Sequence, residues 1–256
     1  MAKTRRTSAQ SRRGSPGCLS MLFLLICVIA AAVAAIFIFF KMRTVEVVGA
    51  EHYAPEQIVS ASGAEIGSNL VFVSKSGMTR GIFAELPYVS EVRINRKLPD
   101  TLVITVSETH AAAYASEGGV YWLIDPSGKI LERCLERPSG VMEITGATPL
   151  MPTVGSKVDF GEESELRLGT FVTAVEALER TGFISEVQSI DLSGVYDLSV
   201  RCCNRFNVEL GAPEELDYKL EYLDAIINDK LRPNQKGSID LSKLIEKGEA
   251  RFLEEY

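Results

Sequence analysis

Residues 88–107 read YVSEVRINRKLPDTLVITVS, and this stretch decides the fold of the first domain. Tyr88–Asn95 and Thr101–Ser107 alternate apolar and polar residues, as strands with one buried face do. Residues 96–100, which include a proline, are predicted to form the turn between them. We therefore expect an antiparallel hairpin whose second strand has one apolar face, made of Leu102, Ile104 and Val106.

The segment before the hairpin adds one strand and two helices. Thr44–Val48 is rich in β-branched residues and precedes a glycine, which predicts a strand. Pro55–Ala61 predicts a short helix, because proline is favoured in a first helical turn. Ser74–Leu86 predicts a second helix, because apolar residues recur there at every fourth position. The predicted order is strand, helix, helix, strand, strand.

Residues 18–40 read CLSMLFLLICVIAAAVAAIFIFF, and no charge interrupts them. At about 1.5 Å per helical residue this run extends roughly 35 Å, enough to cross a hydrocarbon core of about 30 Å. We therefore predict a transmembrane helix over residues 18–40. Its length and its bulky end at Phe37–Phe40 favour an uncleaved anchor over the alternative, a cleaved signal peptide.

The charges around this run predict its orientation. Residues 1–17 contain five bases and no acid, and we expect them to form a disordered basic tail in the cytoplasm, with the rest of the chain outside the membrane. The 34 acids of the chain all lie beyond residue 43. The body is therefore acidic, which argues against a nucleic-acid partner.

The rest of the chain is predicted to be rich in strands, with two packed helices. Residues 137–161 hold several Pro and Gly and are interpreted as a long irregular connection. The first helix covers Glu162–Thr181 and should bury Leu166, Leu168, Phe171, Val175 and Leu178; the second covers Pro213–Leu231. The predicted strands are Ala111–Ala115, Val120–Ile124, Lys129–Glu132, Val187–Leu192, Asp197–Arg201, Arg205–Leu210 and Gly237–Ser242.

Taken together, these patterns indicate an α+β fold in five parts. A basic tail over residues 1–17 precedes the transmembrane helix over 18–40. A first domain over 44–108 is followed by a β-rich domain over 109–242 and a C-terminal tail over 243–256.

The residues that could carry chemistry do not assemble a reacting centre. The sequence has no G-x-S-x-G, H-E-x-x-H or Walker motif, and His52 and His110 are far apart. A disulfide from Cys134 to Cys202 or Cys203 is left open, although free thiols are favoured. We therefore predict no catalytic residue, no metal site, no cofactor and no small-molecule substrate.

Several motifs together resemble a known family. Leu86-Pro87-Tyr88-Val89 leads into Val92, Ile94 and Arg96, then Pro99-Asp100-Thr101-Leu102 precedes Ile104, Val106 and Glu108. Asp125-Pro126-Ser127-Gly128-Lys129 is similar to a D-x-x-G hairpin, and Ser238-Ile239-Asp240-Leu241 to a late strand. With the basic tail and the single span, this pattern resembles the FtsQ family of bacterial division proteins, called DivIB in Gram-positive bacteria.

The resemblance implies a fold, a place in the cell and a set of partners. It implies a POTRA domain (β-α-α-β-β) next to the membrane, then the β-rich domain. It implies a non-enzymatic scaffold of the divisome in the bacterial cell membrane, at the division septum. The implied partners are the single-span proteins FtsB (DivIC in Gram-positives) and FtsL, through which the scaffold helps regulate septal peptidoglycan synthesis.

The resemblance also implies a partner-binding strand near the C-terminus. By position this strand corresponds to Ile239, Asp240, Leu241 and Ser242, with an extension to Ala250, Arg251 and Phe252. A late, short strand is expected at a sheet edge, where its unpaired N–H and C=O groups can pair with a partner's strand. The alternative is an edge that the C-terminal tail covers.

Two functions of other classes compete with the scaffold. One is a membrane-anchored extracytoplasmic cell-wall enzyme whose active site lies in the strand-rich part. The other is a POTRA-containing assembly or transport component, although such proteins usually carry several POTRA units or a barrel, and the sequence predicts neither.

Overall fold

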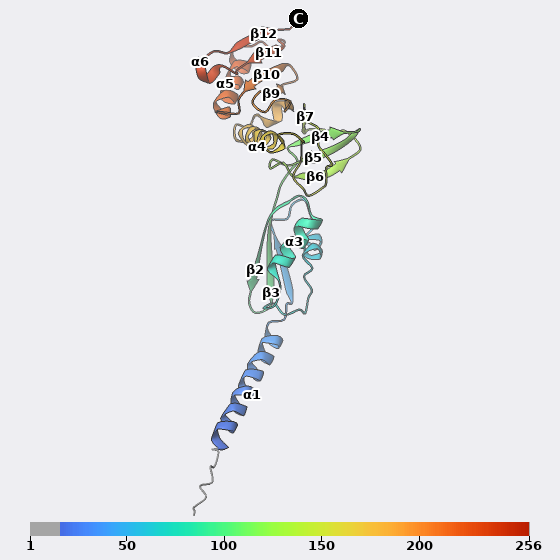
Figure 1. Ribbon diagram of the computed structural model, residues 1–256, viewed down its shortest axis with the longest axis vertical. Helices are drawn as coiled ribbons and strands as arrows, with labels where there is room; N and C mark the ends of the chain where they lie inside the picture. The colour runs from blue at the N-terminus through green and yellow to red at the C-terminus, as the bar shows by residue number, and fades with distance from the viewer. Residues whose placement is uncertain (1–15, 256) are drawn as a thin grey trace, which may run out of the picture.

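The computed structural model describes residues 16–255 and begins with one long helix, α1 (Pro16–Phe39). Within it, Ser20–Phe39 is long and apolar enough to cross a membrane, and none of these residues is buried inside the protein. The helix agrees with the predicted span over 18–40. Most of the predicted basic tail, residues 1–15, lies outside the described residues. Figure 1 shows α1 at one end of an elongated molecule.

The first domain has the predicted order of elements: β1 (Thr44–Val48), α2 (Pro55–Ser62), α3 (Lys75–Glu85), β2 (Val89–Lys97) and β3 (Thr101–Glu108). Its sheet has the order β1-β3-β2, in which β3 pairs parallel with β1 and antiparallel with β2. The core of the domain joins the sheet to both helices and includes Ile58, Leu70, Ile82, Leu102, Ile104 and Val106.

The helices α2 and α3 cross closely because a glycine lies at their contact. A Cβ atom at Gly81 would lie 2.3 Å from the carbonyl oxygen of Ala61. That separation is far below ordinary van der Waals contact, so only glycine fits there. The glycine that weakens the helical propensity of α3 is therefore what permits its packing.

The second domain is built on one sheet of nine strands, in the order β12-β11-β10-β9-β8-β7-β4-β5-β6. Its helices are α4 (Ser164–Arg180), α5 (Leu216–Asp229), the short α6 (Leu244–Lys247) and the 3-10 turn η1 (Phe183–Glu186). The strands are β4 (Ala113–Glu117), β5 (Val120–Ile124), β6 (Ile130–Cys134), β7 (Met142–Thr145), β8 (Val187–Asp191), β9 (Leu198–Cys202), β10 (Phe206–Gly211), β11 (Gly237–Asp240) and β12 (Arg251–Glu254).

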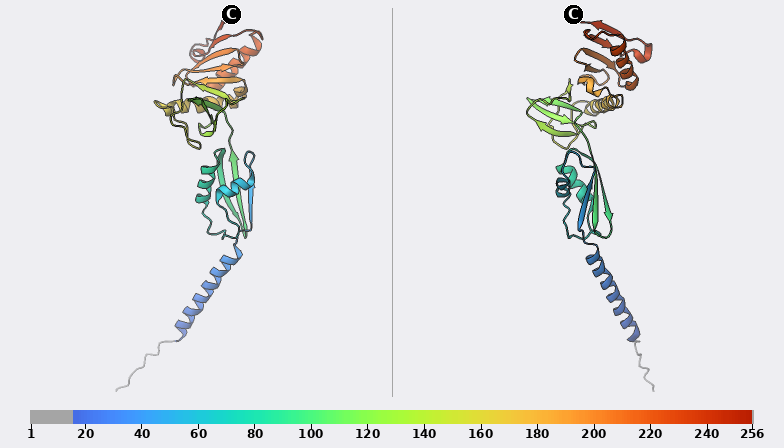
Figure 2. Two further views of the ribbon diagram at one scale, coloured as in Figure 1. Left: turned by 90° about the vertical axis from the view of Figure 1, so that its right-hand side faces the viewer. Right: turned by 180° about the vertical axis from the view of Figure 1, so that it is seen from behind.

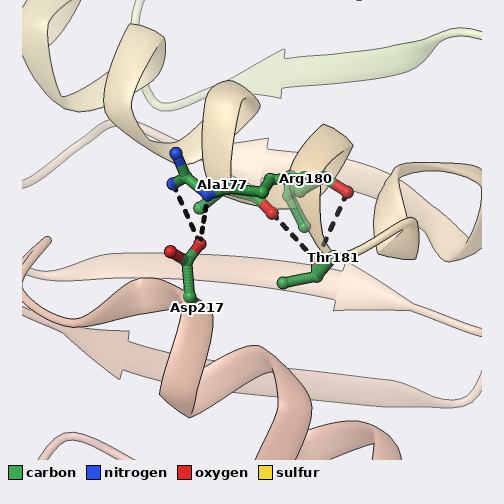
Figure 3. Close-up of polar contacts among 5 residues, drawn as sticks. Ala177, Arg180, Thr181 and Asp217 are labelled. Atoms are coloured by element: carbon green, nitrogen blue, oxygen red, sulfur yellow. Dashed lines mark hydrogen bonds and ion pairs between the residues drawn. The ribbon is translucent and has the colours of Figure 1, made fainter.

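Two parallel crossovers explain where the long helices lie. The chain passes from β7 through α4 to the parallel neighbour β8, and from β10 through α5 to the parallel neighbour β11. Both steps run in the same direction across the sheet, so right-handed connections place α4 and α5 on the same face. The two helices are joined by Arg180, whose Nε and Nη2 donate to Asp217 Oδ1 over 3.1 and 2.9 Å (Figure 3).

Two expectations for residues 137–181 of this domain are wrong. Residues 137–161 are not irregular throughout, because they contain β7, which pairs in parallel with both β4 and β8. In α4, Leu166 is exposed and Leu168 only partly buried, whereas Phe171, Val175 and Leu178 are buried as expected. The buried face of α4 is completed by small residues such as Ala174, which the apolar spacing did not single out.

The two domains meet at a small polar and aromatic junction. The Tyr88 hydroxyl donates to Glu132 over 3.2 Å, and Lys129 Nζ donates to the carbonyl oxygen of Val89 over 2.9 Å. The ring of His52 stacks on Tyr88, with 4.0 Å between ring centroids. The second domain is thus joined to the end of the first domain that faces away from α1 (Figure 2).

Candidate functional site

The strand predicted to form the sheet edge is an inner strand. β11 pairs in parallel with β10 on one side and antiparallel with β12 on the other. The expectation that residues 237–242 lie at an edge is therefore wrong, and the alternative, a cover formed by the C-terminal segment, is what the structure shows. The sequence missed β12 because a four-residue strand within a charged segment gives little alternation to detect.

The four residues predicted on this strand are occupied within the fold. The side chains of Ile239 and Leu241 are buried in the core, with exposed fractions of 1% and 0%. The carboxylate of Asp240 accepts from the backbone N–H and the hydroxyl of Ser242, over 2.9 and 2.6 Å. These hydrogen bonds hold the pKa of Asp240 below its ordinary value and close the turn that ends β11.

The edge of the sheet is β12, and a short return of the chain positions it. Leu244 is buried and anchors α6, and Gly248 ends that helix in the left-handed conformation, with φ of 65°. The chain then reverses and runs antiparallel to β11, with Arg251 opposite Asp240 and Glu254 opposite Gly237. Of the extension predicted from the sequence, Arg251 and Phe252 therefore lie on the edge strand, and Ala250 directly precedes it.

The side chains of β12 divide between the two faces of the sheet. Phe252 and Ala250 pack against the core, and the Phe252 ring lies edge-on to Phe206 with 6.2 Å between centroids. Leu253 points to the other face and is 70% exposed. Arg251 is exposed and lies 3.5 Å from Glu249 in an ion pair. Leu253 and Glu254 were not among the predicted site residues.

The hydrogen-bond register shows which backbone groups of β12 are free. The N–H of Glu255 donates to the carbonyl oxygen of Lys236 over 3.0 Å. In an antiparallel pair, hydrogen-bonded residues alternate with residues whose N–H and C=O point the other way. Arg251 and Leu253 therefore face β11, whereas the N–H and C=O groups of Phe252 and Glu254 face outward. Within residues 16–255 these outward groups meet no partner strand.

The opposite edge of the sheet is partly covered. β6 pairs with β5 on one side only. On its other side the N–H of Ile130 donates to Ser156 O over 2.8 Å, and the N–H of Gly155 donates to Ile130 O over 2.8 Å. A nearby loop thus occupies the start of β6. Among the described residues, no loop makes such backbone hydrogen bonds to the outer side of β12.

The cysteines of the second domain are unsuited to thiolate chemistry. Cys134, Cys202 and Cys203 are free thiols, so the disulfide left open by the sequence is absent from the described residues. Burial raises the pKa of each of these three thiols above its ordinary value. A thiol with a raised pKa stays protonated near neutral pH and is a poor nucleophile or metal ligand.

The chain is similar along most of its length to known division proteins. A family model described as POTRA domain, FtsQ-type, matches residues 40–109. A second model, described as Cell division protein FtsQ/DivIB, C-terminal, matches residues 113–242. The second match covers β4 to β11, and β12 lies beyond it.

Individual relatives agree with the family models. The chain is 29% identical over 207 residues to cell division protein DivIB of Clostridium acetobutylicum, covering 80% of each chain. It is 29% identical over 142 residues to cell division protein FtsQ of Corynebacterium glutamicum, covering 54% of this chain and 63% of the relative. A solved structure, the major extracytoplasmic domain of the trans isomer of DivIB from Geobacillus stearothermophilus, matches at 12% identity and a TM-score of 0.30, over 49% of this chain and 99% of that chain.

Proposed function

The chain belongs to the FtsQ/DivIB family of cell division proteins, and from this premise we propose that it is a non-enzymatic divisome scaffold whose β12 edge binds the single-span partners FtsB/DivIC and FtsL. Through them it helps to regulate septal peptidoglycan synthesis. The observation that carries the proposal is the row of outward backbone groups on β12. A strand edge of this kind is a template for an incoming strand.

The chemistry of the edge favours pairing by strand addition. An incoming strand would exchange hydrogen bonds with the N–H and C=O groups of Phe252 and Glu254. Leu253 would then offer an apolar side chain on the outer face, next to the incoming strand's own side chains. This arrangement replaces the site expected at residues 239–242 with one at residues 250–254. Of the predicted residues it keeps Ala250, Arg251 and Phe252.

The membrane anchor makes a short interface sufficient. We propose that α1 is an uncleaved anchor, with the N-terminus in the cytoplasm and both domains outside the membrane. Confining binder and partner to one membrane raises their effective concentration. A four-residue edge can therefore support a functional complex although its affinity in solution is modest.

A proline substitution tests the edge without disturbing the core. The Glu254 side chain is exposed and its N–H faces outward, so Glu254→Pro removes one donor from the free edge and none from the pairing with β11. Glu254→Ala is the matched control, because it changes the same side chain and keeps the N–H. We expect Glu254→Pro to bind partner ectodomains about tenfold more weakly than Glu254→Ala, the effect of one hydrogen bond of about 1.4 kcal/mol.

The binding assay uses the full chain in a bilayer disc and measures partner affinity for both variants. Equal affinity of Glu254→Pro and Glu254→Ala would show that the backbone of β12 is not the binding surface. Placement in the cell is a separate test: a fluorescent fusion should collect at midcell in dividing bacteria. Uniform membrane fluorescence would contradict the divisome role.

A further inference from the structure

Four exposed apolar side chains gather at the end of the first domain that faces α1. Ile66, Val71 and Phe72 lie in the loop between α2 and α3, and Leu98 lies in the turn between β2 and β3. Their exposed fractions are 64%, 38%, 65% and 61%. We call these four residues the proximal apolar rim. Large apolar side chains clustered on a soluble surface usually mark a contact with a partner or a membrane.

Backbone hydrogen bonds tie the α2–α3 loop to the end of the membrane helix. The N–H of Leu70 donates to Phe40 O over 2.7 Å, and the N–H of Met42 donates to Ser68 O over 2.8 Å. The side-chain amide of Asn69 donates to the carbonyl oxygen of Ile36 over 3.0 Å. The loop that carries three rim residues is therefore held against the last turn of α1.

The depth of the rim follows from the span itself. The ring of Phe72 lies against that of Phe37, with 5.4 Å between centroids. Phe37 is two residues before the end of the span at Phe39, or about 3 Å inside it at the rise of an α-helix. The span is about as long as a hydrocarbon core is thick, so the Phe72 ring lies at the level where that core ends.

The β2–β3 turn lies at the same end of the domain. The N–H of Arg43 donates to Asp100 O over 2.8 Å, which places the turn carrying Leu98 beside the chain that leaves α1. Both views in Figure 2 show this turn and the α2–α3 loop next to the end of α1. The rim is thus built from two separate loops that lie beside the end of α1.

Three basic residues lie near the rim, alongside the acids Glu65 and Asp100. Lys41, Arg43 and Arg96 are exposed, and the Arg96 guanidinium donates to Val73 O over 2.7 Å. An apolar tip flanked by Lys and Arg is typical of segments that enter a lipid interface, because the bases meet anionic headgroups.

From these contacts we infer that the proximal apolar rim inserts into the outer boundary of the bilayer that α1 crosses, and so docks the first domain on the membrane surface. The occupant of the rim is lipid, because the span that positions the bilayer is part of the same chain and touches the rim directly. The inference rests on α1 crossing a membrane. It does not depend on partner binding at β12.

Tryptophan fluorescence in lipid tests this inference. The chain has one tryptophan, Trp122 in β5, so Phe72→Trp adds one probe at the rim. Phe83→Trp is the matched control, since Phe83 is 39% exposed in α3 of the same domain and does not belong to the rim. The full chain is placed in vesicles of phosphatidylcholine and phosphatidylglycerol. The acyl chains of these lipids carry bromine near their glycerol end, and bromine quenches tryptophan fluorescence.

We expect the bromolipid to quench the added emission of Phe72→Trp at least twofold and to leave that of Phe83→Trp nearly unchanged. Leu98→Trp is a second rim probe, which keeps the test decisive if one variant folds poorly. Equal quenching of the rim probes and Phe83→Trp would overturn the inference. Because the purified chain is alone in the vesicle, quenching reports lipid and not a partner protein, and the result is separate from the outcome at β12.

Discussion

Replacing Gly237 with alanine should lift β12 from the sheet. Gly237 begins β11, between Phe206 of β10 and Glu254 of β12. A Cβ atom added there would lie 2.0 Å from the carbonyl oxygen of Leu253 and 3.1 Å from the Cα of Glu254. Both atoms belong to the backbone of β12, so no side-chain rotation can relieve the clash.

The size of the effect can be worked from these distances. Ordinary van der Waals contact begins at 3.4 Å, so β12 must move by about 1.4 Å to accept a methyl group that would otherwise lie 2.0 Å away. A hydrogen bond of about 2.9 Å lengthened by that amount is effectively lost, at about 1 kcal/mol for each bond. Overpacking of this kind costs about 1–3 kcal/mol, comparable with what holds a short edge strand in place. We therefore expect local detachment of β12 and not unfolding of the domain.

Hydrogen exchange measures this outcome directly. In Gly237→Ala the amides of Arg251 and Leu253 should exchange about thirtyfold faster, the equivalent of about 2 kcal/mol, whereas amides in β8 and β9 should stay protected. Gly169→Ala is the control. Gly169 lies in α4 with nothing within 4 Å of the added Cβ, so this substitution should stabilise the protein by about 0.5–1 kcal/mol. Wild-type protection of the β12 amides in Gly237→Ala would refute the packing argument.

Three further changes have defined outcomes. Asp240→Asn should lower the free energy of unfolding by about 1 kcal/mol at pH 7. Because Ser242 holds the pKa of Asp240 below its ordinary value, the stability that this carboxylate contributes is lost as the pH falls. In urea unfolding, the difference in stability between wild type and variant should therefore close below about pH 4. Gly81→Ala should cost about 1–3 kcal/mol despite better helix propensity, since its Cβ would lie 2.3 Å from Ala61 O; an unchanged melting temperature would contradict this. Burial, and then the charge of Glu132, raise the pKa of Tyr88 to about 12, which an ultraviolet titration of the tyrosine should show. Because the unfolded chain ionises this tyrosine near pH 10, the free energy of unfolding should fall between about pH 10 and 12. Tyr88→Phe should lose less stability than wild type over the same range.

The first domain was predictable because its local signals agree with its tertiary structure. The alternation in β3 places Leu102, Ile104 and Val106 on the buried face, as expected. The proline at the start of α2 and the glycine after it mark the helix that the structure shows. A hairpin with one buried face depends on neighbouring residues, so periodicity alone finds it.

The second domain was harder because its decisive features depend on distant residues. β7 has only four residues, and its pairing with β4 and β8 brings together segments that are far apart in the sequence. Leu166 fits an apolar spacing, yet it lies in the first turn of α4, beyond the reach of the sheet. The position of β12 could not be predicted for the same reason, because no local pattern in residues 251–254 indicates which strand they pair with. Residues 239–242, predicted to lie at the edge, therefore belong to an inner strand and its end, and only the predicted extension reaches the edge strand β12.

The arrangement of the first domain sets a minimum reach for any protein that meets β12. β2 and β3 run along the long axis between α1 and the second domain, and nine residues of β2 extend about 30 Å at the rise of a strand (Figure 1). A second protein anchored in the same membrane must extend at least this distance from the membrane to contact β12, which takes about twenty residues of continuous helix. The first domain thus sets a minimum distance between the membrane and β12, and a membrane-bound protein that extends less far cannot contact β12, whatever its sequence.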